Sequence, residues 1–464
     1  MKKTLHTKIF VSIFLLFAVS FSAFSQTWQI VTTKYATTDA IVAGYVVDAA
    51  TYGNGTTDAT AYIQGLLNNL DNYTGDNNHG GGVVYLPEGR YKISGRLNIP
   101  KGITLRGDWK KPVKGQPIVG TIIQVYADKG TDLDAQGRAN SFITMESGAA
   151  VMDLAFWYPE QDPNNIVPYP PTIQFGKPNY FGDEFCNAKD ITLINSYYGI
   201  IFYQGGGTCP TINGVYGTPL KQGVEIDRIV DIGRIEHCDF SPKYWAGSGL
   251  PNSPAITNTT YTNWIYNNGT GIVMRRNDWS YTCYLTVEGY NKGFHALQSR
   301  QMDGGGYATP NGHNYGFDLK NCKYGIYFES RASEGCMFAE VKTAGCEFGA
   351  YFTGNAGGVG QLIKCELSAT KCAIYTDKNA STKITLQEST IKAGKVLLQG
   401  GTLVAVNNDF NNPQPQIQFE ANSRGDIIGN RFAQTAQISQ NSVFVNKIDH
   451  TPVTMKALPA YREF

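Results

Sequence analysis

Residues 47–108 constrain the fold more than any other part of this 464-residue chain. Thr56 or Thr57 suits a helix N-cap, because its side-chain oxygen can accept hydrogen bonds from first-turn amides. An amphipathic helix is predicted next, with an apolar face of Ala59, Ile63, Leu66, Leu67 and Leu70. Three glycines end this pattern, and short apolar runs separated by Gly or Pro follow at 83–86, 90–93, 96–99 and 103–106. One helix leading into evenly spaced short strands predicts the capped first coils of a parallel β-solenoid.

An internal repeat supports the same architecture. The pattern aromatic-Gly-aliphatic-x-Phe occurs at 198–202, 324–328 and 348–352, with a degenerate copy at 372–375. Gly349 follows Gly325 by 24 residues, and Ala373 follows Gly349 by 24 more. A period of this length fits one coil of three strands and three turns. We expect the repeated glycine to lie where neighbouring coils approach closely.

On these residues, 47–108 resembles the start of the pectate-lyase-like superfamily, whose members are right-handed parallel β-helices acting mostly on polysaccharides. The stretch 216–245, together with FWYPEQ (156–161) and YPPTIQ (169–174), is similar to tandem β-helix enzymes such as glycoside hydrolase family 55. That resemblance implies an all-β, right-handed parallel β-helix with an N-terminal capping α-helix. It also implies that this chain corresponds to the N-terminal half of such an enzyme, so no catalytic residue is carried over from it.

The N-terminus predicts export. Three lysines precede an apolar run from Ile9 to Val19, and Ala23-Phe24-Ser25 offers a small-x-small cleavage site before Gln26. The expected organisation is a signal peptide at 1–25, a lead-in at 26–46, a β-helix at 47–448 and a linker-like tail at 449–464. The expected location is periplasmic or extracellular. No later window is apolar enough for a membrane span.

Charge and cysteine content narrow the class further. The formal net charge of +1, without a long basic run, argues against nucleic acid as a partner. The nine cysteines include no Cys-x-x-Cys motif. Four of them precede an apolar residue by two positions, as two asparagines also do: Cys238, Cys322, Cys346, Cys365, Asn408 and Asn430. We interpret these six as one internal ladder of stacked side chains, with room for one or two disulfides elsewhere.

Three stretches interrupt the repeat. Residues 159–178 carry six prolines, 239–264 are rich in Pro, Ser, Asn and Thr, and 301–314 are rich in glycine. Loops of this length are usually functional, so we expect walls beside a groove. The tail shows no closing repeat, which predicts a second β-helix domain or a partner covering that end.

The acidic segment 216–245 is the best candidate for catalysis. Strand alternation places Glu225 and Asp227 on the outward face, and Asp231 follows at a turn. Asp227 and Asp231 are the predicted catalytic pair, because glycoside hydrolysis uses two carboxyl groups. The alternative is that the acidic residues here are ordinary exposed coil positions.

Aromatic and cationic side chains predict substrate contacts, because sugar rings pack on aromatic faces. The predicted set is Trp157, Tyr158, Arg234, Trp245, Arg276 and Trp279. Trp264 is a further aromatic candidate, and two of the aromatic residues are expected to be internal instead.

These observations predict a carbohydrate-active protein with an open groove along the solenoid, a hydrolase first and a polysaccharide lyase next. The polygalacturonase and pectate lyase signature motifs are absent. The alternatives are a non-catalytic carbohydrate-binding β-helix or the first half of a tandem enzyme. No metal site and no cofactor are predicted, and calcium is the alternative to consider if the reaction is elimination.

Overall fold

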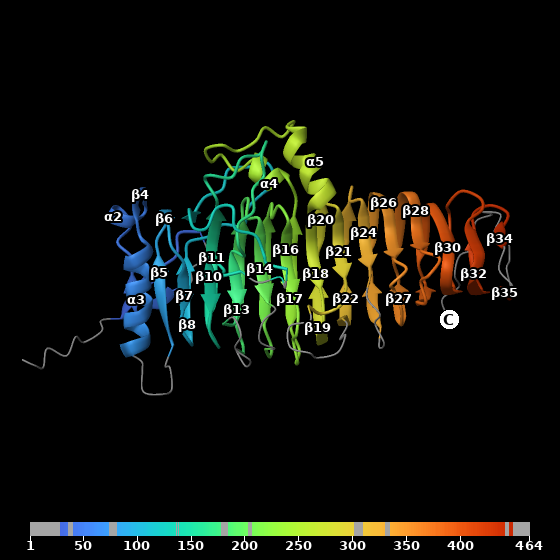
Figure 1. Cartoon of the computed structure of the whole chain (residues 1–464), viewed down its shortest axis with the longest axis horizontal. Coiled ribbons are helices and arrows are strands. Elements are labelled where there is room, and N and C mark those ends of the chain that lie inside the picture. Colours follow the sequence, from blue (N-terminus) through green and yellow to red (C-terminus); the bar gives the residue numbers. More distant parts are fainter. Residues whose placement is uncertain are drawn as a thin grey trace, which may run out of the picture.

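A computed structural model shows a parallel β-helix whose coils stack in one direction (Figure 1). It describes residues 28–35, 40–73, 81–135, 137, 139–177, 184–202, 207–300, 310–329, 335–440 and 445–448. The predicted signal peptide, the C-terminal tail and residues 301–309 of the glycine-rich stretch therefore lie outside the described residues. No helix in the described ranges has the length and apolar character needed to cross a membrane.

Three rows of parallel strands form the faces of the right-handed β-helix. Row 1 contains β7 (Leu97–Ile99), β10 (Ile143–Met145), β12 (Ile173–Phe175), β14 (Tyr198–Phe202), β16 (Gln222–Ile226), β18 (Thr270–Met274), β21 (Lys292–Ala296), β24 (Tyr324–Phe328) and β34 (Ile438–Gln440). Row 2 contains β3 (Tyr45–Val46), β5 (Gly82–Leu86), β8 (Ile103–Gly107), β19 (Asn277–Cys283), β22 (Pro310–Tyr315), β25 (Cys336–Ala339), β27 (Val359–Ile363), β29 (Lys383–Gln387) and β35 (Val445–Ile448).

Row 3 contains β4 (Asn54–Asp58), β6 (Gly89–Ile93), β9 (Thr121–Val125), β20 (Thr286–Glu288), β23 (Asp318–Lys320), β31 (Asp409–Phe410) and β33 (Arg431–Phe432). Longer strands bend across two rows: β11 (Ala150–Trp157), β13 (Asn187–Leu193), β15 (Thr211–Gly217), β17 (Arg234–Phe240), β26 (Lys342–Phe352), β28 (Glu366–Thr376) and β32 (Ile417–Ile428). The longest strand, β30 (Thr390–Val406), crosses all three rows. An antiparallel pair, β1 (Gln29–Thr32) and β2 (Ala40–Ala43), precedes the coils.

The helices lie outside these rows. They are α2 (Ala49–Tyr52), α3 (Thr60–Tyr73), α4 (Lys243–Ala246) and α5 (Thr259–Asn268). The capping helix is confirmed as α3, which lies at the blue end of the stack in Figure 1. Its predicted start was two or more residues too early. Thr56 and Thr57 belong to β4, and the Asp58 carboxylate accepts the Thr60 amide at 2.9 Å instead.

The predicted 24-residue coil is confirmed by strand register. Tyr324 pairs with Phe348, which pairs with Cys372. The repeated glycine has a steric cause, because a Cβ on Gly325 would lie 2.6 Å from the Gly349 carbonyl oxygen. The same relation extends back along row 1 through Gly199, Gly223, Gly271 and Gly293. Real Cβ atoms do not approach that closely, so the column fixes how tightly these coils stack.

The cysteines are internal, as predicted, but they do not form one ladder. Cys322 and Cys346 share one position, because each lies two residues before the paired Tyr324 and Phe348. Cys365 occupies a different corner, in the same position as Ser389, Asn408 and Asn430. At both corners the polar or cysteine residue lies two positions before an apolar residue. The sequence alone therefore could not distinguish the two positions, and the prediction treated them as one ladder. All nine cysteines are free, and no disulfide forms.

The second predicted excursion is confirmed and contains α4 and α5. It meets the proline-rich loop 158–172, since the Asn258 amide donates to Asn164 Oδ1 at 3.2 Å. α5 runs beside the N-terminal ends of row 1 strands in the middle of the stack. There the Tyr266 hydroxyl donates to Glu347, which directly precedes the row 1 segment of β26, at 2.7 Å. The two loops and α5 project from one side of the solenoid in Figure 1.

Candidate functional site

The outward side chains of row 1 change character along the stack. One register position passes through Gln174, Ile201, Glu225, Val273 and His295, all buried at 8% exposure or less. The same position then continues through Tyr327, Tyr351 and Tyr375, which are half-buried. The row therefore has a covered part and an open part, and they meet between His295 and Tyr327.

Glu225 is the centre of the covered part. Arg300 donates to it from Nε at 2.6 Å and from Nη2 at 2.7 Å, and Arg275 Nε donates at 2.7 Å. The Gln222 side chain adds a fourth donor at 2.7 Å. Burial opposes ionisation, but the Arg300 and Arg275 guanidiniums outweigh it and lower the pKa of Glu225 to about 2. Glu225 is therefore a fixed carboxylate that anchors two arginines.

Asp227 follows two residues later on the same face, as strand alternation predicts. It is fully buried, and the Arg300 amide donates to its Oδ2 at 2.8 Å. Its Oδ1 has no hydrogen-bond partner among the described residues. Burial raises the pKa of Asp227 to about 7. A carboxyl group with this pKa can hold and release a proton near neutral pH.

His295 and Glu329 form a pair at the boundary of the open part. His295 Nε2 lies 2.9 Å from Glu329 Oε2, and the Glu329 side chain is 37% exposed. Burial lowers the pKa of His295 to about 4, so its imidazole is neutral at pH 7. The hydrogen bond from His295 lowers the pKa of Glu329. The ionised carboxylate accepts a hydrogen bond from Nε2–H, which leaves Nδ1 unprotonated with a free lone pair.

Five half-buried rings make up the open part, and we call them the aromatic platform: Tyr324, Tyr327, Phe348, Tyr351 and Tyr375. Successive rings contact one another across coils. Tyr327 stacks on Tyr351 at 5.3 Å between centroids, and Tyr351 contacts Tyr375 at 4.8 Å. The His295 ring lies 5.2 Å from Tyr327, so the platform begins at the His295–Glu329 pair.

Lys292 lies at the same junction, with Nζ 4.6 Å from the centre of the Tyr327 ring. Burial lowers its pKa. Lys292, the neutral imidazole of His295 and the aromatic platform therefore lie together where the covered part of row 1 meets the open part. Sequence reasoning assigned the repeated aromatic residues to coil packing and missed the platform. The signal was available, because Tyr327, Tyr351 and Tyr375 recur every 24 residues at an outward position.

The structure does not bring the predicted catalytic pair together in one cluster. Asp227 lies beneath Arg300, whereas Asp231 is exposed in the turn between β16 and β17. No finding tests the catalytic role of either residue, and both roles stay predictions.

The predicted substrate-binding residues divide into two groups. Three lie inside the protein, because Trp157 belongs to the core, Tyr158 bonds Thr172 at 2.8 Å, and Trp245 packs against Tyr261. Their predicted surface position was therefore wrong. Local composition marks a loop residue, and it does not show whether a ring fastens that loop to the core.

The other three predicted binding residues lie away from the platform. Arg234 begins β17, Trp279 lies on β19 and is 55% exposed, and Arg276 pairs with Asp278 at 2.8 Å. Arg234 and Trp279 lie on the row 2 segments of β17 and β19, so neither lines the open part of row 1. Arg276 lies in the turn between β18 and β19.

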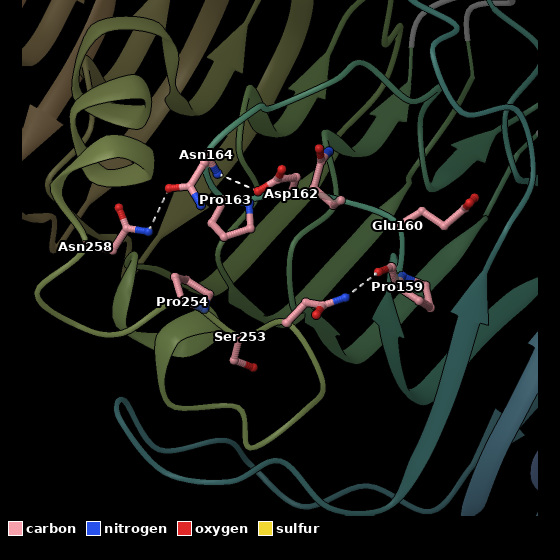
Figure 2. Close-up of a pocket in the computed structure, with 10 residues that line it drawn as sticks. Pro159, Glu160, Asp162, Pro163, Asn164, Ser253, Pro254 and Asn258 are labelled. Carbon is pink, nitrogen blue, oxygen red and sulfur yellow. Dashed lines mark hydrogen bonds between the residues drawn. The ribbon is translucent and has the colours of Figure 1, made fainter.

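A separate cavity of about 500 Å³ lies where the two long loops meet (Figure 2). Its walls come from residues 159–164 and from Asn252, Ser253, Pro254 and Asn258. In Figure 2, Asp162, Asn164 and Asn258 are joined to neighbouring loop residues by hydrogen bonds. These polar groups stabilise the loops. Among the described residues, no group of three or more His, Cys, Asp or Glu side chains could hold a metal ion.

Comparison with known proteins agrees with this architecture. Residues 45–154 match the family model described as rhamnogalacturonase A/epimerase, pectate lyase-like. This match covers the first coils of the parallel β-helix, where the sequence resembles the pectate-lyase-like superfamily. No curated protein matches the chain significantly. The resemblance to glycoside hydrolase family 55 is untested and stays a prediction.

Solved structures similar to this chain include the A-module of the Azotobacter vinelandii mannuronan C-5 epimerase AlgE4. It is 14% identical with a TM-score of 0.49, covering 88% of this chain and 100% of that one. The tailspike of E. coli bacteriophage HK620 is 10% identical with a TM-score of 0.44, covering 86% and 69%. The DFA-IIIase of Arthrobacter chlorophenolicus A6 is 11% identical with a TM-score of 0.36, covering 87% and 94%.

Proposed function

We propose that this protein is an enzyme that cleaves a polysaccharide lying on the open part of row 1, with the reaction beside His295 and Glu329. One observation carries the proposal. Along a single register position of row 1, the covered part ends at the His295–Glu329 pair and the aromatic platform begins directly beside it. Aromatic faces pack against the C–H faces of sugars. The pectate-lyase-like family model that matches residues 45–154 supports the same substrate class.

Elimination is the reaction that the groups at the border of the open part favour. A lyase needs a base to remove the proton beside a uronate carboxylate, and cations that stabilise the resulting negative charge. His295 is neutral and oriented by Glu329, and Lys292 lies next to the same ring. In this mechanism Nδ1 of His295 takes the proton from the carbon beside the carboxylate, and the electron pair of that C–H bond forms the C=C bond of the product. The glycosidic C–O bond breaks with its electron pair on the leaving oxygen, which takes a proton from water.

Hydrolysis is the second candidate, and Asp227 is the observation in its favour. A protonated carboxyl group with a pKa of about 7 is suited to donate a proton to the leaving oxygen. Substrate contact would require the segment at Ser299 and Arg300 to move, because Asp227 is fully buried beneath it. We therefore propose elimination before hydrolysis, which is the reverse of the order expected from sequence.

The deciding experiment incubates residues 26–464 with a panel of acidic and neutral polysaccharides. New reducing ends establish cleavage, and ultraviolet absorbance from an unsaturated product identifies elimination. His295→Ala should lower the rate about 10²- to 10⁴-fold, the usual contribution of a general base. Glu329→Gln is the matched control, because it keeps a hydrogen-bond acceptor and should lose less. Full activity in a folded His295→Ala protein would contradict the proposed site.

A non-catalytic carbohydrate-binding β-helix, or half of a tandem enzyme, is the outcome indicated by a folded protein that releases nothing. Polysaccharide binding would then depend on the platform. Tyr351→Ala should abolish it, whereas Tyr351→Phe keeps the ring and loses only the 2.9 Å hydrogen bond to Asp377.

A further inference from the structure

The covered part of row 1 has a second consequence, which rests on the proposed function. Two chain segments lie across its outer face. One is the loop between β9 and β10, whose Asp132 accepts the Tyr198 hydroxyl at 2.7 Å. The other is the segment 297–300 that follows β21, and its Arg300 is held by Glu225 and Asp227. The outward side chains of the register position from Gln174 to Val273 are all buried. The two segments contact two of them, because Ser141 donates to Gln174 at 2.8 Å and Arg300 donates to Glu225 at 2.6 Å.

The two segments also touch each other. A Cβ on Gly137, in the first segment, would overlap the Arg300 guanidinium, so the arginine passes directly over this glycine. Gly137 has a φ of +77°, which a residue with a side chain rarely adopts. The first loop and Arg300 are therefore in contact at Gly137, and both lie over the covered part of row 1.

The cover is firmly attached. Arg300 makes two charge-assisted hydrogen bonds to a carboxylate that is completely buried, and its amide makes a third bond to Asp227. Displacing Arg300 would leave buried charges without their partners, which is costly. Stacking of a polysaccharide on half-buried rings does not supply the free energy needed to displace Arg300, so the bound polymer leaves this barrier in place.

We propose that this barrier makes the enzyme act on chain ends. A polysaccharide that runs along the platform from Tyr375 towards Tyr327 meets the barrier directly after His295. Only a terminal segment can then occupy the reacting position, so short products leave from one end of the chain. Arg300 and Asp132 are positioning residues for this specificity. They hold the barrier and do not take part in the bond cleavage.

The test uses the polysaccharide that wild-type protein degrades best, and follows product length and solution viscosity over time. Chain-end action should release short products from the first time point while viscosity stays high. A copy of the polymer with both ends blocked should resist the enzyme. Mixed long products with a rapid fall in viscosity would overturn this inference and leave the proposed function standing. No cleavage of any polymer would instead overturn the proposed function, and the inference with it.

Two variants test the barrier itself. Arg300→Ala should open it, and Asp132→Ala should loosen it if the first variant does not fold. Each should raise the share of long products and the rate on end-blocked polymer about fivefold or more, because a tether to the cover is lost. A merely structural role would lower all rates without changing product length. Lys129→Ala is the control, since its pair with Glu160 is at the surface, and it should leave the product profile unchanged.

Discussion

Two carboxyl groups on one strand face show how environment decides the role of a residue. Glu225 and Asp227 lie two positions apart and are both fully buried. Two guanidiniums hold the pKa of Glu225 at about 2, whereas burial raises that of Asp227 to about 7. This difference in pKa follows from which donors contact each carboxylate. Arg300 donates from its charged guanidinium to Glu225 but only from its uncharged backbone N–H to Asp227.

Asp227 should make folding stability depend on pH. Its pKa rises from 3.8 to about 7 on folding, so the native protein holds a proton that the unfolded chain releases. Its contribution to stability is complete below about pH 4 and declines as pH rises towards 7. Asp227→Asn cannot ionise and should gain stability relative to wild type across that range, by at most about 4 kcal/mol. Denaturant unfolding of both proteins from pH 4 to 8 measures this, and a constant difference would contradict it.

Secondary-structure elements owe their spacing to small residues at defined places. The glycine column in row 1 brings β16, β18 and β21 so close that an added methyl group has no room. A Cβ on Gly223 would lie 2.5 Å from the Gly271 carbonyl oxygen and 2.5 Å from the Phe240 ring. Since Glu225 follows Gly223 on the same strand, the column also positions the covered part of the site.

Gly223→Ala should therefore destabilise the protein by about 1–3 kcal/mol, the usual cost of overpacking. Gly65→Ala is the matched control. Gly65 lies inside α3 with nothing within 4 Å of the added atom, and the change should stabilise the helix by about 0.5–1 kcal/mol. Thermal unfolding of the two variants gives the comparison. Equal effects would show that close approach is not the reason for the glycine.

At the scale of the whole molecule, different parts of the solenoid carry the cap, the candidate site and the long loops. α3 covers the first coil, row 1 carries the candidate site, and the loops with α4 and α5 stand on one side of it. Each coil contacts only its neighbours, so a loop can be long without disturbing the core. This is why segments as different as 158–172 and 297–300 can be added to the same scaffold.

Export remains a proposal at this scale, and it concerns residues outside the described part. We expect the signal peptide to be removed after Ser25, so the mature protein should begin at Gln26. N-terminal sequencing of the protein recovered from the periplasm or the medium tests this. Recovery of the intact Met1 terminus from the cytoplasm alone would contradict it.

The sequence by itself determined the repeat, the capping helix and the internal position of the cysteines. Each of these depends on local spacing, because side chains 24 residues apart must stack once the coil length is constant. The alternation that puts Glu225 and Asp227 outward is likewise a property of one strand. Patterns of this kind are readable without knowing what lies across the fold.

Only the tertiary structure decided which distant groups meet. Arg300 reaches Glu225 across 75 residues, and the loops between their coils vary in length, so no spacing records the contact. The same reason applies to Trp245, which is buried, and to Trp279, which is exposed. Whether a ring or a charge is covered depends on where a long loop folds back. That position is set by packing between coils, not by the residues beside it in the chain.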